Sequence, residues 1–104
     1  MGAKKYLIFV KPSADQRFAD HVAFLARVSE RAAVGLYQEY EEALEFLEEN
    51  PESCPLYMTS MLADATLRYK LFGKRYRIVF EIVDNAVYAY DIQDCRQDTD
   101  KNLI

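Results

Sequence analysis

Apolar and polar positions alternate most regularly in residues 67–82. A period of two over several residues is typical of a β-strand that has one face against a core. The first strand of this segment alternates Leu67, Tyr69 and Leu71 with Arg68 and Lys70. Gly73 then supplies a backbone that can turn. The pattern therefore predicts a β-hairpin.

Beyond the turn, a second strand is predicted by the same alternation. Its apolar positions are Tyr76, Ile78, Phe80 and Ile82, which alternate with Arg75, Arg77, Val79 and Glu81. We expect the apolar sets of both strands to pack on the core. The opposite face would hold the basic side chains, which are Arg68, Lys70, Arg75 and Arg77, with Lys74 at the turn. The hairpin therefore predicts one basic surface.

A strand and a helix are predicted ahead of this hairpin. Residues 5–11 form a short apolar run between lysines, which predicts a first strand that Pro12 ends. The apolar residues that follow recur at helical spacing: Ala14, Phe18, Val22, Leu25 and Val28. We expect a helix capped by Ser13, with Gln16 as its capping-box partner.

A second helix is predicted from its N-cap Ser29 to about Glu49. Asn50 and Pro51 would end it. Its buried stripe would comprise Leu36, Tyr40, Ala43, Leu44 and Leu47. Seven glutamates lie between residues 39 and 52 with no Lys or Arg among them. Such a run is typical of a solvated outer face.

The remaining segments complete the predicted sheet. Residues 54–66 are too apolar for a free loop, so we expect them to pack across a sheet edge, with a partner's docking surface as the alternative. Residues 86–93 predict a last strand after a three-residue loop. This register places Ile82 opposite Tyr88, Phe80 opposite Tyr90, Ile78 opposite Ile92, and Arg77 opposite Gln93. Asp91 would lie near the basic face, either to orient an arginine or to neutralise it.

The order of elements predicts an α+β fold with two layers. An N-terminal strand and an antiparallel two-helix hairpin precede an antiparallel meander that packs on the helices. The chain has 104 residues, of which 51% are hydrophobic. That length suits one domain over residues 1–104.

The distribution of charge makes the hairpin stand out. Residues 67–82 contain five Lys or Arg and one acid, a net charge of +4, although the whole chain carries −4 and the remainder therefore −8. A local positive field on an acidic protein suggests a site for a polyanion or an acidic peptide. The alternative is that basic residues keep an exposed strand face soluble and discourage edge pairing.

Other chemistry is sparse in the sequence. No apolar run of about 18 residues and no signal pattern occurs, which predicts a cytoplasmic protein without a membrane partner. Cys54 and Cys95 lack a CxxC spacing and are expected to be reduced thiols. His21 stands at the edge of a helical stripe without ligand-spaced neighbours, so we expect a surface or boundary residue. We expect no metal and no cofactor.

Three stretches of the sequence resemble the RelE/ParE family of bacterial toxins, some of which are known as plasmid stabilisation proteins. They are Leu-Phe-Gly-Lys-Arg-Tyr-Arg-Ile-Val-Phe-Glu-Ile at residues 71–82, the later Val-Tyr-Ala-Tyr-Asp-Ile strand, and the closing Asp-Cys-Arg-Gln-Asp. The resemblance covers nearly the whole chain and is most specific over residues 71–98. It implies a RelE-like fold and a growth-inhibiting toxin of a type II toxin-antitoxin system, neutralised by a cognate antitoxin.

Two activities divide this family. RelE-like members enter the ribosome and cut mRNA without a metal, using the RNA 2′-hydroxyl as nucleophile. ParE-like members inhibit DNA gyrase without performing chemistry. The first activity, an endoribonuclease acting through the basic sheet face, is our expectation. The gyrase inhibitor and an inactive binding module are the alternatives.

The resemblance also implies roles for particular residues. Arg77 matches the arginine that binds the scissile phosphate, Arg68 and Lys70 match a basic pair on the preceding strand, and Arg96 lies near a second arginine after the last strand. Guanidinium groups hold phosphate charge bidentately. Lys70 would move a proton if cationic neighbours and burial lowered its pKa. Lys74 and Arg75 would bind phosphate or partner. The C-terminal tyrosine of the family has no counterpart, because no tyrosine follows Tyr90.

Overall fold

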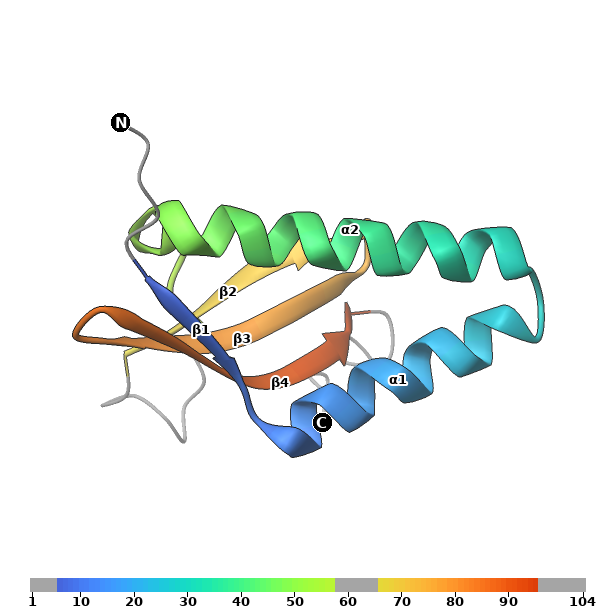
Figure 1. Ribbon diagram of the computed structural model, residues 1–104, viewed down its shortest axis with the longest axis horizontal. Helices are drawn as coiled ribbons and strands as arrows, with labels where there is room; N and C mark the ends of the chain where they lie inside the picture. Colours follow the sequence, from blue (N-terminus) through green and yellow to red (C-terminus); the bar gives the residue numbers. More distant parts are fainter. Residues whose placement is uncertain (1–5, 58–65, 96–104) are drawn as a thin grey trace.

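The computed structural model describes residues 6–57 and 66–95. Within these ranges the elements follow the order β1 (Leu7–Val10), α1 (Pro12–Ala26), α2 (Glu30–Glu49), the 3-10 helix η1 (Pro51–Ser53), β2 (Leu67–Phe72), β3 (Tyr76–Val83) and β4 (Ala86–Asp94). This order is the α+β arrangement that the sequence predicts (Figure 1).

The strands form one mixed sheet in the order β1-β4-β3-β2. The last three strands make the expected antiparallel meander. β1 lies parallel to β4 at the edge of the sheet, with Phe9 opposite Tyr88. The two helices connect β1 to β2, so the chain crosses the whole sheet before the meander begins.

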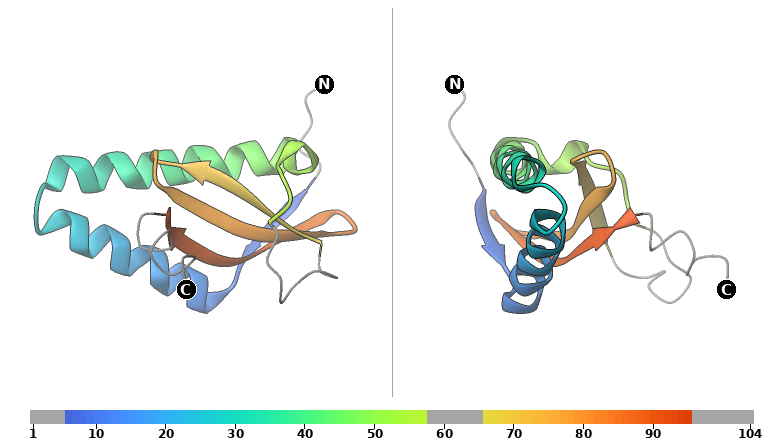
Figure 2. Two further views of the ribbon diagram at one scale, coloured as in Figure 1. Left: turned by 180° about the vertical axis from the view of Figure 1, so that it is seen from behind. Right: turned by 90° about the vertical axis from the view of Figure 1, so that its right-hand side faces the viewer.

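The two helices run antiparallel and make the second layer. α2 lies alongside β2, α1 lies alongside β4, and the turn between them extends beyond the end of the sheet (Figure 1). Seen from behind, β2, β3 and β4 face the viewer (Figure 2). No helix in the described ranges is long and apolar enough to cross a bilayer.

The core fills the space between the helices and the sheet. Phe80, Ile78, Ile92, Val87 and Leu47 are its largest fully buried apolar side chains. Burial of each such side chain contributes about 1.5–3 kcal/mol relative to exposure. An aromatic group joins both layers, because the ring centroid of Phe72 in β2 lies 6.1 Å from that of Phe18 in α1 and 5.6 Å from that of Tyr40 in α2.

The two helix starts differ in mechanism. Ser29 caps α2 as predicted, since its hydroxyl accepts a hydrogen bond from the Ala32 N–H at 3.1 Å. The predicted Ser13 cap is wrong: α1 begins at Pro12, and its N-cap residue Lys11 makes no side-chain cap. Proline suits the first helical position because its ring fixes φ and it has no N–H that needs a partner.

The apolar stripes of the helices are mostly as predicted. Ala14 and Phe18 of α1 are buried, and so are four of the five stripe residues of α2. Val28 is an exception with 76% exposure, because α1 ends at Ala26 and the helical phase stops there.

The predicted facing of β2 is wrong. The loop between β2 and β3 has three residues, so Phe72 pairs with Tyr76 and Lys70 with Ile78. Arg68 and Lys70 therefore point to the helix side of the sheet. Leu67, Tyr69 and Leu71 point to the other side. The buried, stacked Phe72 explains this register, because the opposite parity would expose it.

The predicted length of the loop between β3 and β4, three residues, is one residue too long. The turn consists of Asp84 and Asn85, so Val83 pairs with Ala86. Phe80 consequently pairs with Ala89 and not with Tyr90. A β-bulge after Val79 inserts one extra residue in β4, which restores the predicted pairs further along. The restored pairs are Ile78 with Ile92 and Arg77 with Gln93.

Residues 55–57 lie along the edge of β2, as expected for the segment after α2. The Tyr57 N–H donates to the Leu67 carbonyl at 2.7 Å, and the Tyr69 N–H donates to the Pro55 carbonyl at 3.1 Å. The rest of that predicted segment, residues 58–65, lies outside the described residues.

Candidate functional site

The sheet has one face turned away from the helices, which we call the open face. Its side chains come from alternate positions of β2, β3 and β4, since the intervening positions point to the helix side of the sheet. The members near its centre are Tyr69, Leu71, Arg77, Val79, Glu81, Tyr88 and Gln93. Arg77 is the predicted site residue that this face presents.

Arg77 is held by its neighbours on the open face. Its Nε donates a hydrogen bond to Gln93 Oε1 at 2.7 Å. Its guanidinium carbon lies 5.0 Å from the ring centroid of Tyr57 and 5.8 Å from that of Tyr69. These two rings meet edge to face, with centroids 6.3 Å apart. Cation–π attraction and the hydrogen bond together fix the position of the guanidinium.

A chain of polar contacts connects Arg77 to α1. Gln93 Nε2 donates to Asp91 Oδ2 at 3.1 Å, and Asp91 Oδ1 lies 3.5 Å from an Nη atom of Arg17. An ionised carboxylate only accepts hydrogen bonds, so Asp91 favours the amide orientation that turns Gln93 Oε1 toward Arg77. Of the two roles expected for Asp91, this contact fits the orienting one.

The hydroxyl of Tyr57 also contacts Gln93, at 3.3 Å from Nε2 and 3.4 Å from Oε1. Gln93 thus touches both the guanidinium and one of the rings beside it. The amide is consequently the central polar group of this cluster.

The other predicted basic residues lie elsewhere. An Nη atom of Arg68 donates to the carbonyl oxygens of Cys54 at 2.7 Å and Glu52 at 3.3 Å. Lys70 Nζ lies 4.2 Å from the ring centroid of Phe46 on α2. Both contacts are on the helix side of the sheet, where the long side chains reach outward from the edge strand β2.

Lys74 and Arg75 belong to the loop between β2 and β3. Lys74 has a φ of 72° and is exposed, and the Arg75 carbonyl accepts a hydrogen bond from the Cys95 N–H at 2.6 Å. The alternation predicts Arg75 as a strand residue on the same face as Arg77. This prediction is wrong, because β3 begins at Tyr76 and Arg75 lies in the loop. Arg96 lies outside the described residues.

The predicted single basic surface does not form. Arg77 lies on the open face, while Arg68 and Lys70 lie on the opposite side of the same sheet. Groups that act together on one phosphodiester must converge within hydrogen-bond reach of it. Lys70 is consequently not placed to move a proton at Arg77.

The structure adds Tyr57, Tyr69 and Gln93 to the candidate site. The sequence pattern had assigned Tyr69 to the core, and Tyr57 lies where that pattern weakens. The predicted strand register placed Gln93 opposite Arg77, so the sequence already indicated that these two side chains are neighbours. Had the hairpin loop been predicted to contain three residues, the pattern would have placed Tyr69 on the open face with Arg77, because an odd loop length reverses the facing of β2.

The lone histidine and the cysteines lie apart from Arg77. His21 Nε2 is 3.0 Å from the Ile92 carbonyl oxygen, and its ring packs against Tyr76 with centroids 5.2 Å apart. This confirms a boundary position between α1 and the sheet. Cys54 and Cys95 are both thiols, and burial raises the pKa of the Cys54 thiol against the opposing influence of Lys70 and Arg68.

Apolar and aromatic side chains continue the open face to both edges of the sheet, at β2 and at β1. Leu71 is 52% exposed and Phe9 47%. Phe9 stacks on Tyr88 with ring centroids 5.2 Å apart. Tyr90 donates a hydrogen bond to Glu81 Oε1 at 2.7 Å. Arginine and aromatic side chains of this kind are the residues that most often anchor protein interfaces.

Comparison with known proteins gives one family. A family model described as the ParE toxin of the type II toxin-antitoxin system parDE matches residues 8–99. The match includes both helices and all four strands of the sheet apart from Leu7, the first residue of β1. No curated protein matches the chain.

Proposed function

Because the chain belongs to the ParE toxin family of type II toxin-antitoxin systems, we propose that it stops growth by binding its target through the open face around Arg77. The family implies an antitoxin partner. If the toxin acts by binding alone, the family resemblance implies that its target is DNA gyrase. It would then act in the cytoplasm.

The observation that carries this proposal is the separation of the basic side chains. Arg77 is fixed by Gln93 and two tyrosines on a face that also presents apolar and aromatic side chains, whereas Arg68 and Lys70 contact groups on the helix side. A rigid arginine among aromatic side chains is suited to anchoring a protein partner. RNA cleavage would need several charged groups at one phosphate.

Cleavage of mRNA on the ribosome is the second candidate, and one observation favours it. The rings of Tyr57 and Tyr69 flank the Arg77 guanidinium at 5.0 and 5.8 Å. A phosphate bound by Arg77 would lie near their hydroxyl groups, which can donate and accept protons. These tyrosines would then take the place of the C-terminal tyrosine that the sequence lacks.

The antitoxin is proposed to cover the same open face. An acidic segment would bring carboxylates to Arg77, and its apolar side chains would cover Phe9, Leu71 and Tyr88. Neutralisation would then follow from exclusion of the target.

Controlled expression tests the proposal. The parent protein, Arg77→Ala and the control Arg31→Ala are induced from a tight promoter without antitoxin; Arg31 is an exposed residue at the start of α2. Growth, mRNA 5′ ends and supercoiling by purified gyrase are measured. We expect arrest and gyrase inhibition without new ribosome-phased 5′ ends, and a loss of potency of about 30-fold or more in Arg77→Ala alone, as for an interface anchor.

Each other outcome has a distinct meaning. Ribosome-phased 5′ ends with unimpaired supercoiling would establish the nuclease. A folded Arg77→Ala protein as potent as the parent would exclude Arg77 from the site. Absence of arrest by the parent protein would indicate an inactive binding module.

A further inference from the structure

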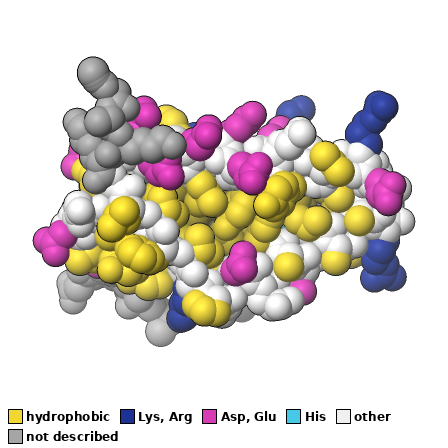
Figure 3. Space-filling view, viewed as in Figure 1, with side chains coloured by type: hydrophobic (Ala, Val, Ile, Leu, Met, Phe, Trp, Pro, Cys, Tyr) yellow, Lys and Arg dark blue, Asp and Glu magenta, His cyan; other side chains and the backbone are white. Residues whose placement is uncertain are grey.

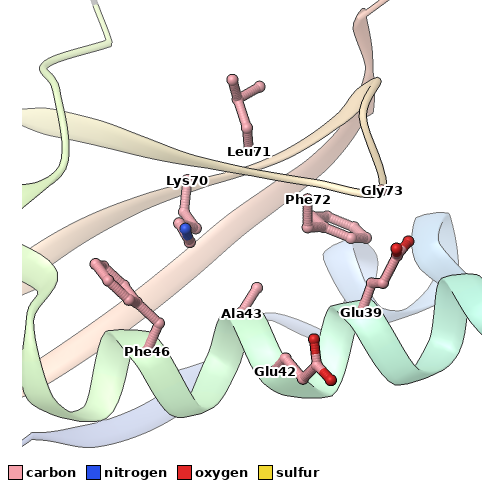
Figure 4. A pocket seen from close by; sticks show the side chains of 8 residues that line it. All are labelled: Glu39, Glu42, Ala43, Phe46, Lys70, Leu71, Phe72 and Gly73. Carbon is pink, nitrogen blue, oxygen red and sulfur yellow. The ribbon is translucent and has the colours of Figure 1, made fainter.

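A groove runs between α2 and the outer edge of β2, on the other side of the sheet from Arg77. Its central hollow has a volume of about 320 Å³ and is shown in Figure 4. Phe46 and Phe72 contribute apolar side chains to it, and Glu39 and Glu42 line it on α2. A second hollow of about 390 Å³ shares Glu42 and Phe46 and continues along α2.

The α2 side of this groove is acidic. The glutamates that line the two hollows are Glu39, Glu42, Glu45 and Glu49. All four are exposed, and no ion pair of theirs occurs within the described part of the chain. Figure 3 shows acidic side chains gathered over α2. The groove therefore has a negative potential that a cationic segment would complement.

The groove already accommodates one ammonium group, from the protein itself. Lys70 Nζ points into the hollow and lies 4.2 Å from the ring centroid of Phe46 (Figure 4). An ammonium over an aromatic face gains cation–π attraction. Even with this charge counted against the four glutamates, the groove keeps a net negative charge.

The β2 edge of the groove offers unused backbone groups. Residues 55–57 bond to this edge at Leu67 and Tyr69. The next outward-facing position is Leu71, because backbone groups that point to one edge recur every second residue. No backbone bond from a described residue reaches Leu71 on this edge. The ladder thus stops beside the acidic hollow.

We propose that this groove binds an extended segment, rich in lysine or arginine, of a partner protein. The segment adds to the β2 edge at Leu71 and places its cationic side chains against the α2 glutamates. The spacing suits a strand: the glutamates span ten residues of helix, about 15 Å, and three side chains on one face of a strand span about 13 Å. The inference is independent of the open face and of how the toxin acts.

A pair of double variants tests the charge requirement. Glu42→Gln/Glu45→Gln alters the groove, and Glu30→Gln/Glu41→Gln makes the same net change elsewhere on α2. The probe is a fluorescein-labelled Lys-Val-Lys-Val-Lys-Val peptide, and its acidic Glu-Val analogue is the comparison. Anisotropy should show that the groove variant binds the basic peptide about threefold to tenfold more weakly than the control variant does, as expected for two lost ion pairs.

Hydrogen exchange on the parent protein tests the edge. Bound basic peptide should slow exchange of the Leu71 amide and leave the Arg77 amide, on the neighbouring strand, unchanged. Equal binding of the basic peptide by the two double variants would overturn the proposal. So would equal binding of the acidic peptide, no detectable binding by the parent, or binding without protection of Leu71.

Discussion

At the scale of single residues, Gln93 matters because it contacts three members of the Arg77 cluster, which are Arg77 itself, Asp91 and Tyr57. Its oxygen accepts from Arg77, its nitrogen donates to Asp91, and the Tyr57 hydroxyl lies within 3.4 Å. These contacts hold the Arg77 guanidinium in one orientation on the open face. Gln93 is therefore a positioning residue for the proposed site.

Replacement of Gln93 by leucine should weaken the toxin. Gln93→Leu keeps the approximate shape of the side chain but removes its hydrogen bonds to Arg77, Asp91 and Tyr57, so Arg77 loses its fixed orientation. We expect a potency about tenfold lower, the equivalent of roughly 1.4 kcal/mol for a bond to a charged group. The amount of purified protein that half-inhibits the target gives the measurement.

The control is Gln38→Leu, which makes the same change at an exposed position of α2. Equal potency of both variants, with thermal stability unchanged, would show that Gln93 has no positioning role. A loss that is matched by loss of folding would assign Gln93 to the structure alone.

Gly73 is the residue that makes the β2–β3 loop possible. Its φ is +60°, and an added Cβ would lie 2.9 Å from Leu36 Cδ1 and 3.2 Å from Glu39 Oε1. Gly73→Ala should therefore reduce the free energy of unfolding by about 1–3 kcal/mol, measured in denaturant. Gly35→Ala is the contrast: its Cβ meets nothing within 4 Å in the middle of α2. That change should stabilise the protein by about 0.5–1 kcal/mol.

At the scale of elements, the helix starts provide the clearest difference between pattern and structure. Ser29→Ala removes the hydrogen bond to the Ala32 N–H and should cost about 1 kcal/mol of stability. Ser13→Ala is the matched change at the position where the capping pattern had indicated a helix start. It should change stability by less than about 0.5 kcal/mol, because α1 has no side-chain cap. Equal losses in denaturant unfolding would contradict both assignments.

The strand β2 shows how far an alternating pattern can predict a surface. Its period of two was correct, and its residues do form a hairpin with β3. The face was wrong because Phe72 ends the strand and is buried among aromatic rings from both layers. Burial of one large ring outweighs the solvation of Arg68 and Lys70, whose long side chains reach the surface around the edge of the sheet.

At the scale of the whole molecule, the two sides of the sheet differ in the chemistry that they offer. The open face presents an oriented arginine among aromatic side chains, and the groove on the helix side presents carboxylates beside Leu71, the part of the β2 edge that no backbone bond from a described residue reaches. The net charge of −4 thus conceals two surfaces suited to different partners. A toxin with this arrangement could bind a target and a basic segment at separate sites.

Alkaline pH should weaken the fold as a whole. Burial, followed by the nearby Asp15 and Tyr37, raises the pKa of the Tyr40 phenol to about 12. Between about pH 10 and 12 the unfolded chain therefore binds fewer protons than the folded one, so stability falls as the pH rises. Tyr40→Phe should reduce this fall, as measured by denaturant unfolding at pH 9 and pH 11. An identical fall in both proteins would show that Tyr40 does not cause it.

The sequence by itself determined the order of elements, the extent of both helices to within about two residues, and the pairing of Arg77 with Gln93. Those features depend on local periodicity, on capping groups and on pairs close in the chain. The tertiary structure alone decided that β1 joins β4, that Tyr57 and Tyr69 flank Arg77, and that Lys70 faces α2. One residue in a loop reverses the facing of a strand, and only packing of the complete core selects between the two facings.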